Sequence, residues 1–152
     1  MTDRSVVHST FTIERTYNVS ASSVFSAFAD QETKRRWFVE GEGWQIHEYH
    51  NDFRTGGREG ARFQFRGGPE IVNDTLYQNI VHDRRIVFSY TMTVAGNCIS
   101  ASLSTVELMQ ENGGTRLVYT EQGAYFDGRD GPKQRKQGWG KLLAALTNEL
   151  GG

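Results

Sequence analysis

Cysteine, proline and long apolar runs are all scarce in this sequence, and each scarcity excludes something. The 152 residues include one cysteine, Cys98, and two prolines. A single cysteine excludes an intramolecular disulfide, which favours a reducing compartment. No stretch approaches the roughly 20 apolar residues of a membrane span, and no apolar run follows a basic start as in a signal peptide. We therefore expect a cytoplasmic protein that does not span a membrane.

Charge of either sign is not in excess. The chain has 17 basic and 18 acidic side chains, and its formal net charge is -1. Nucleic acids and anionic membrane surfaces select for basic faces, so neither is an expected partner. His47 and His50 have an odd spacing within a predicted strand, which places them on opposite faces, so no metal site is predicted. The glycine-rich segment 54–60 lacks the Gly-Lys-Ser/Thr ending of a phosphate loop, and we predict no cofactor.

Period-two and period-three-to-four patterns divide the chain into strands and helices. Residues 11–17 alternate as a strand does. Ser20 and Asp30 are placed to act as N-caps of two short helices, the second of which ends near Trp37. Further strands are predicted at residues 44–53, 61–66, 71–81, 85–92, 98–110 and 115–126. Asn112 and Gly113 predict a tight hairpin between the last two strands.

The last segment has the clearest helical pattern. Asp130 is the expected N-cap and Pro132 lies in the first turn. An apolar stripe at spacings of three and four is formed by Trp139, Leu142, Leu143, Leu146 and Leu150. Gly138 and Gly140 interrupt this helix, and each costs about 1 kcal/mol relative to alanine. We expect them to permit a close approach of another backbone or some local give.

These elements predict an α+β fold in a single domain covering residues 1–152. The order is strand, two short helices, several antiparallel strands and a long C-terminal helix, and a sheet covered on one face by a helix is a common layer arrangement. Aromatic residues make up 12% of the chain, so large rings supply much of the buried area. A curved antiparallel sheet wrapped around one helix leaves a gap between them, and such gaps are ordinary ligand sites.

Several segments in this order resemble one known family. They are Tyr17-Asn-Val-Ser-Ala-Ser-Ser-Val-Phe25, Trp37, Asp52-Phe-Arg-Thr-Gly-Gly57, Asp83-Arg-Arg-Ile-Val-Phe88, Thr120-Glu-Gln-Gly-Ala124 and Gly138-Trp139. Together they are similar to the START-like, or SRPBCC, superfamily with its helix-grip fold. Within it they resemble the branch named after the activator of the heat-shock chaperone ATPase. His82 departs from the proline that many relatives have there.

The resemblance implies a cavity that binds a small hydrophobic or amphipathic molecule, lipid-like or polyketide-like. Two alternatives stay open. One is a polyketide cyclase-like or hydrolase-like enzyme that uses the same cavity. The other is a co-activator of a chaperone ATPase, which acts as a protein-interaction domain. A homodimer is also plausible, because exposed sheet edges often pair.

The candidate site residues follow from the strand faces and from the C-terminal helix. Leu117, Tyr119 and Glu121 share one face of their strand, so an inward carboxylate could serve as acid, base or ligand anchor, or as a structural hydrogen-bond acceptor. The candidate ligand-binding residues are Trp37, Phe63, Phe65, Tyr77, Phe88, Tyr90, Tyr119, Glu121, Trp139 and Leu143. For the tyrosines and tryptophans, the alternative is ordinary core packing. Cys98 has no visible base beside it, so we predict a small buried side chain rather than a nucleophile.

Overall fold

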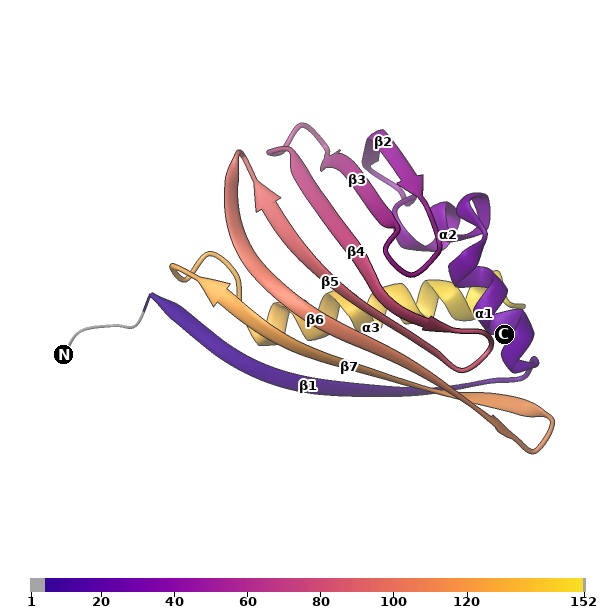
Figure 1. Cartoon of the computed structure of the whole chain (residues 1–152). Helices are drawn as coiled ribbons and strands as arrows, with labels where there is room; N and C mark the ends of the chain where they lie inside the picture. Colours follow the sequence, from indigo (N-terminus) through magenta and orange to yellow (C-terminus); the bar gives the residue numbers. More distant parts are fainter. Residues whose placement is uncertain (1–4, 152) are drawn as a thin grey trace.

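In the computed structural model, which describes residues 5–151, a curved sheet wraps around a long C-terminal helix (Figure 1). The elements in chain order are β1 (Val6–Tyr17), α1 (Ala21–Ala29), α2 (Gln31–Phe38), β2 (Trp44–Asn51), β3 (Arg58–Phe65), β4 (Ile71–Val81), β5 (Arg85–Val94), β6 (Asn97–Glu111), β7 (Gly114–Phe126) and α3 (Pro132–Glu149). The seven strands are ordered β1-β7-β6-β5-β4-β3-β2, and neighbours are antiparallel. The predicted α+β helix-grip fold is confirmed.

The topology explains why two short helices follow the first strand. β1 and β2 lie at opposite edges of the sheet, so α1 and α2 carry the chain from one edge to the other. The strands from β2 to β7 then return by hairpins until β7 pairs with β1. Figure 1 shows α1 and α2 gathered near the C-terminal end of α3. α2 also reaches the middle of α3, where the ring of Phe38 packs against Trp139 with centroids 5.9 Å apart.

The predicted caps of the short helices are confirmed. Ser20 Oγ accepts a hydrogen bond from the backbone N–H of Ser23 at 3.1 Å. The Asp30 carboxylate accepts from the backbone N–H of Thr33 at 3.0 Å and from its hydroxyl at 2.6 Å. These side chains satisfy N–H groups that have no partner within the first helical turn. The two caps therefore fix where α1 and α2 begin.

The prediction of Asp130 as the cap of α3 is wrong. Gly131 occupies the N-cap position without a side-chain bond, and Pro132 follows it in the first turn. The carboxylate of Asp130 instead accepts from the guanidinium of Arg135. A nearly buried guanidinium needs a carboxylate partner more than an N-terminal turn needs a cap.

Of the two roles expected for the glycines of α3, the close approach of another backbone is wrong. A Cβ atom at Gly138 would meet nothing within 4 Å among residues 5–151. A Cβ atom at Gly140 would lie 3.8 Å from Nη2 of Arg15, which is ordinary van der Waals contact. Neither glycine is therefore required by packing in the interior.

The strands extend beyond several predicted ends, and their irregularities curve the sheet. Register shifts interrupt the pairing between Ile46 and Glu48, between Tyr77 and Asn79, and beside Met92. Bulges of this kind bend a strand and increase its twist, so they help the sheet close around α3. The predicted hairpin is confirmed, since Asn112 and Gly113 have φ of 43° and 80° as a type I′ turn requires.

The prediction of a buried Cys98 is wrong. Its side chain is exposed, and its thiol lies 3.6 Å from the backbone oxygen of Ser100. The residue is the second of β6, directly after the turn that joins β5 and β6, and it pairs with Thr93 beside the bulge at Met92.

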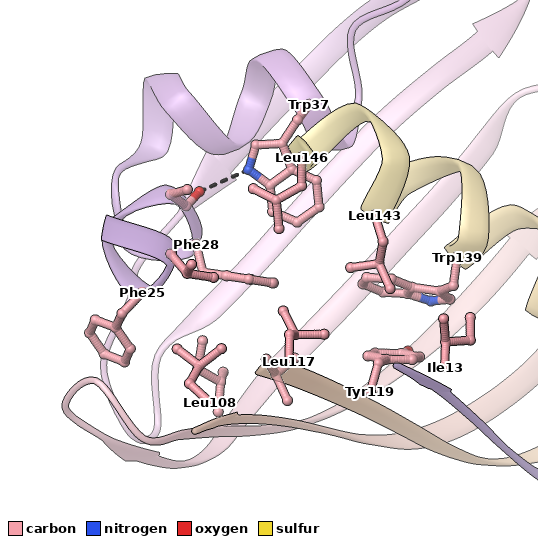
Figure 2. Close-up of a cluster of buried hydrophobic side chains, with 14 of the residues drawn as sticks. Ile13, Phe25, Phe28, Trp37, Leu108, Leu117, Tyr119, Trp139, Leu143 and Leu146 are labelled. Carbon is pink, nitrogen blue, oxygen red and sulfur yellow. Dashed lines mark hydrogen bonds between the residues drawn. The ribbon is translucent and has the colours of Figure 1, made fainter. Parts of the chain in front are cut away.

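The core lies where α3 packs on the inner face of the sheet (Figure 2). The indole of Trp139 stacks on the ring of Tyr119, with centroids 4.1 Å apart. One and two turns further along α3, Leu143 and Leu146 are fully buried, as is Leu117 on β7. Burying a large apolar side chain contributes about 1.5–3 kcal/mol, so this stripe holds the C-terminal half of α3 firmly.

A buried ion pair joins α2 to the sheet. Nζ of Lys34 lies 2.8 Å from both carboxylate oxygens of Glu59 on β3, and the two side chains are 2% and 1% exposed. The hydroxyl of Tyr49 donates to Glu59 at 2.6 Å. The ammonium group also lies 4.4 Å from the ring centroid of Phe38, a cation–π distance. Breaking such a pair leaves a buried charge alone, so the position of α2 depends on it.

We predict that Glu59→Gln lowers the free energy of unfolding by about 3–5 kcal/mol, because Lys34 then stays buried without a counter-charge. Urea unfolding followed by circular dichroism measures this loss.

The matched control is Glu149→Gln, which breaks the more exposed pair of Glu149 with Arg36. That change should cost no more than about 1 kcal/mol. Equal losses in the two variants would contradict the structural role of the buried pair.

Candidate functional site

A pocket of about 610 Å³ lies between α3 and the strands from β2 to β6. Its floor consists of well-buried side chains: Trp37, Val39, Asn73, Tyr90, Ile99 and Trp139. Its rim consists of exposed residues: Glu40, Gly41, Glu42, Gln134, Gly138 and Lys141. The volume is within the range of sites for small molecules. The pocket runs along α3 from Gln134 to Ala145, and α2 contributes Trp37 and Phe38 to its lining.

Aromatic side chains supply much of the pocket's inner surface, which includes the floor and is called the wall below. Trp37 donates its indole N–H to the backbone oxygen of Ala27 at 2.9 Å, which fixes its ring (Figure 2). Trp44 and Phe63 pack edge to face, with centroids 5.3 Å apart, and Trp44 is 38% exposed. All three tryptophans of the chain line this pocket. The wall therefore offers large apolar surfaces to a ligand.

The rim is charged and comes from two elements. Glu42 lies in the loop between α2 and β2, and Lys141 lies on α3. Gln134, Gly138 and Lys141 follow each other at spacings of four and three, so they lie on one stripe of the helix. The rim therefore combines a carboxylate, an amide and an ammonium group around an apolar floor.

Behind the floor lies a buried polar network centred on Glu121. Its carboxylate is 0% exposed. One oxygen accepts from the hydroxyls of Tyr90 at 2.7 Å and Tyr119 at 2.6 Å, and the other accepts from Ser102 at 2.9 Å. Longer contacts come from Ser104 at 3.4 Å, Tyr125 at 3.4 Å and Nη1 of Arg135 at 3.3 Å. Together these donors satisfy the lone pairs of the carboxylate.

Tyr90 connects this network to the pocket. Its hydroxyl donates to Glu121 and accepts from Nη1 of Arg135 at 3.0 Å and from the indole N–H of Trp139 at 3.3 Å. Burial raises the pKa of Tyr90, and the nearby Glu121 carboxylate adds to the effect. The phenol therefore stays protonated and keeps donating. One donor and two acceptor positions are all in use, which is the full capacity of a hydroxyl.

Arg135 is the cation of the network. Its side chain is 10% exposed and also donates to Ser100 at 2.8 Å and to Asp130. Burial works against the charged form, but Tyr90 and the carboxylates of Glu121 and Asp130 raise the pKa of Arg135 overall. The guanidinium stays charged and holds the first turns of α3 to β5, β6 and β7.

The structure brings four of the predicted site residues to the pocket and places six elsewhere. Trp37, Phe63, Tyr90 and Trp139 line it. Tyr77, Phe88, Tyr119, Glu121 and Leu143 are buried in the interior, and Phe65 is 41% exposed near the β2–β3 edge. The four buried residues on strands face inward, but the helices fill the space in front of them, and Leu143 on α3 is part of that filling. For example, the Tyr119 ring is covered by Trp139.

Sequence reasoning missed several lining residues. Asn73 lies on β4, where Nδ2 contacts Sδ of Met92 and Oδ1 accepts from Thr75 at 2.9 Å. Arg135 lies outside the predicted apolar stripe of α3. Gln134, Gly138, Lys141 and Ala145 form a second stripe at spacings of four, three and four, and this pattern marks the side of the helix that borders the pocket.

Comparisons with known proteins agree with this geometry. A family described as "Activator of Hsp90 ATPase homolog 1-like protein" matches residues 18–151. The chain is 55% identical to the Mll3558 protein from Rhizobium loti, over 96% of this chain and 99% of that one, with a TM-score of 0.89. It is 38% identical to a protein from Rhizobium leguminosarum, over 98% of each chain, with a TM-score of 0.92.

More distant structures share the fold alone. The AHSA1-like protein from Aeromonas hydrophila is 18% identical over 93% of this chain and 92% of that one, with a TM-score of 0.72. None of the curated proteins matches the chain. No helix among residues 5–151 has the length and apolar character that crossing a membrane requires.

We predict that Glu121→Gln lowers the free energy of unfolding by about 2 kcal/mol or more. The variant replaces one carboxylate oxygen by an NH₂ group, so the donors that bonded to that oxygen lose their acceptor. Chemical unfolding monitored by tryptophan fluorescence measures this loss.

Glu107→Gln is the control, since Glu107 is exposed on the neighbouring strand β6. It should change stability by no more than about 0.5 kcal/mol. A Glu121→Gln protein as stable as this control would show that the network does not hold α3 to the sheet.

Proposed function

The chain belongs to the family of activator of Hsp90 ATPase homolog 1-like proteins, within the SRPBCC superfamily, and from that premise we propose that it binds a small molecule. The ligand is hydrophobic or amphipathic, lipid-like or polyketide-like. It enters the pocket between α3 and the sheet with its apolar part on the aromatic floor.

The observation that carries this proposal is the contrast between floor and rim. On the floor, the hydroxyl of Tyr90 and the indole N–H groups of Trp37 and Trp139 already have hydrogen-bond partners. A polar group placed against these three side chains loses its bonds to water and gains none from them, which costs free energy. An apolar group loses nothing by entering, and each buried CH₂ contributes about 0.8 kcal/mol.

The rim supplies the partners for a polar end. Neither Glu42 nor Lys141 forms an ion pair with any other described residue. Their opposite charges, with the amide of Gln134 on the same rim, suit a head group that donates and accepts hydrogen bonds. The proposed ligand is therefore oriented with its tail inward and its head at the rim.

The network around Glu121 favours binding over catalysis. A general acid or base needs to be within hydrogen-bond reach of the group it protonates or deprotonates. Glu121 is behind the floor, and its oxygens accept from tyrosine, serine and arginine donors instead. Its role in this proposal is to hold Tyr90 and Arg135 in place. The lone, exposed Cys98 suits a reducing compartment, so we place this binding in the cytoplasm.

Binding of an uncharged apolar probe, N-phenyl-1-naphthylamine, tests the proposal. Because all three tryptophans line the pocket, the bound probe should accept excitation energy from them. We predict saturable binding to the wild-type protein. Ala145 also lines the pocket, so Ala145→Phe should weaken binding by about tenfold or more, which is roughly 1.4 kcal/mol.

Ala144→Phe provides the matched control, because Ala144 is the exposed neighbour on the same helix. Its affinity for the probe should stay within roughly twofold of the wild type. The absence of saturable binding to the wild-type protein, or equal weakening by both variants, would refute the pocket as the binding site.

A further inference from the structure

Gly138 is unusual among the residues that line the pocket. It lies in the interior of α3, where glycine is the least suitable residue apart from proline. The hairpin glycine Gly113 needs its positive φ, but the φ angle of Gly138 is not in the left-handed region. The backbone conformation of Gly138 therefore gives no reason for the missing side chain.

Packing gives no reason either. A Cβ atom built at Gly138 would meet nothing within 4 Å among the described residues. At Gly57, by contrast, the same atom would come within 2.1 Å of the backbone oxygen of Asp52. Space for a side chain therefore exists at position 138, and Gly138 itself lines the pocket.

The position of Gly138 on the helix makes the space important. It lies between Gln134 and Lys141 on the stripe that forms the helical part of the rim. Side chains on a helix lean toward its N-terminus, so a larger residue here would lean over the turn that carries Gln134 and Arg135. It would narrow the opening through which a ligand reaches Trp139 and Tyr90.

We propose that Gly138 sets the cross-section of ligands that the pocket accepts. The missing side chain keeps the opening wide enough for a ring system, at the cost of a less stable helix. This inference rests on the proposed function, since an opening has a meaning only if a ligand passes through it. The inference assigns the ligand to a class of molecules with a wider cross-section than a single alkyl chain, such as fused or linked rings.

Two probes of different width test the inference. N-phenyl-1-naphthylamine presents linked aromatic rings, and decanol presents a single chain. Calorimetric titration should show that Gly138→Leu weakens binding of the naphthylamine by about tenfold or more, while decanol binding stays within roughly threefold. Gly138→Ala should give an intermediate loss for the naphthylamine and a higher Tm, because alanine favours the helix.

Gly140 provides the matched control, because it lies in the same helix but outside the pocket lining. Gly140→Ala should also raise the Tm, and neither Gly140→Ala nor Gly140→Leu should change the affinity for either probe. The Gly138→Ala variant keeps the test valid even if the leucine variant folds poorly.

The outcomes separate the two ideas. If the wild-type protein binds neither probe saturably, the proposed function fails and the inference fails with it. The size-selecting role is refuted, while binding stands, if the wild type binds both probes and the Gly138 variants bind both with wild-type affinity. The same holds if the variants lose affinity for both probes to the same extent. Selective loss of the wider probe at position 138, without loss at position 140, supports the inference.

Discussion

The hydroxyl of Tyr90 joins the sheet to α3 at the point where the packed core gives way to the pocket. It donates to Glu121 on β7 and accepts from Arg135 and Trp139 on α3. Further along the same helix, Leu143 and Leu146 pack on the sheet and are fully buried. The pocket lies alongside them, because Gln134, Gly138, Leu142 and Ala145 of α3 border it together with side chains from β2 to β6. One face of α3 thus packs on the sheet, and the adjoining face borders the cavity.

The same arrangement explains why a buried carboxylate is tolerated in a domain of this size. Burying a charge without partners is costly, but the carboxylate of Glu121 has tyrosine, serine and arginine donors around it. Those donors come from β5, β6, β7 and α3. A network with this many members specifies one arrangement of the four elements, since any shift leaves a buried group without its partner. A rigid floor reduces the ordering that a ligand must cause when it binds.

The second buried charge pair fixes the side of the pocket that α2 forms. Lys34 and Glu59 connect α2 to β3, and α2 carries Trp37 and Phe38 into the pocket. Both walls are thus attached to the sheet by buried ionic groups, whereas the rim residues are exposed. Rigid walls with an exposed rim agree with a site whose shape is largely formed before the ligand arrives.

Local patterns in the sequence determined the elements of this protein. The alternation of residues 11–17, the caps at Ser20 and Asp30 and the turn at Asn112 depend on neighbours within a few positions, so the sequence alone predicts them. The inward face of β7 was predictable for the same reason. The order of these elements indicated the α+β class, and the family resemblance added the helix-grip fold.

Only the tertiary structure decided which inward side chains meet a cavity and which meet other side chains. Tyr90 and Tyr119 both face inward, yet Tyr90 borders the pocket and Tyr119 lies beneath Trp139. The pocket is lined by strands from β2 to β6, whereas Tyr119 on β7 lies directly under α3, so the outcome depends on which strands the helix covers. Sheet curvature, bulge positions and long-range pairs such as Arg135 with Glu121 together fix where α3 lies on the sheet. Residues far apart in the chain form these features, so no short segment contains the information.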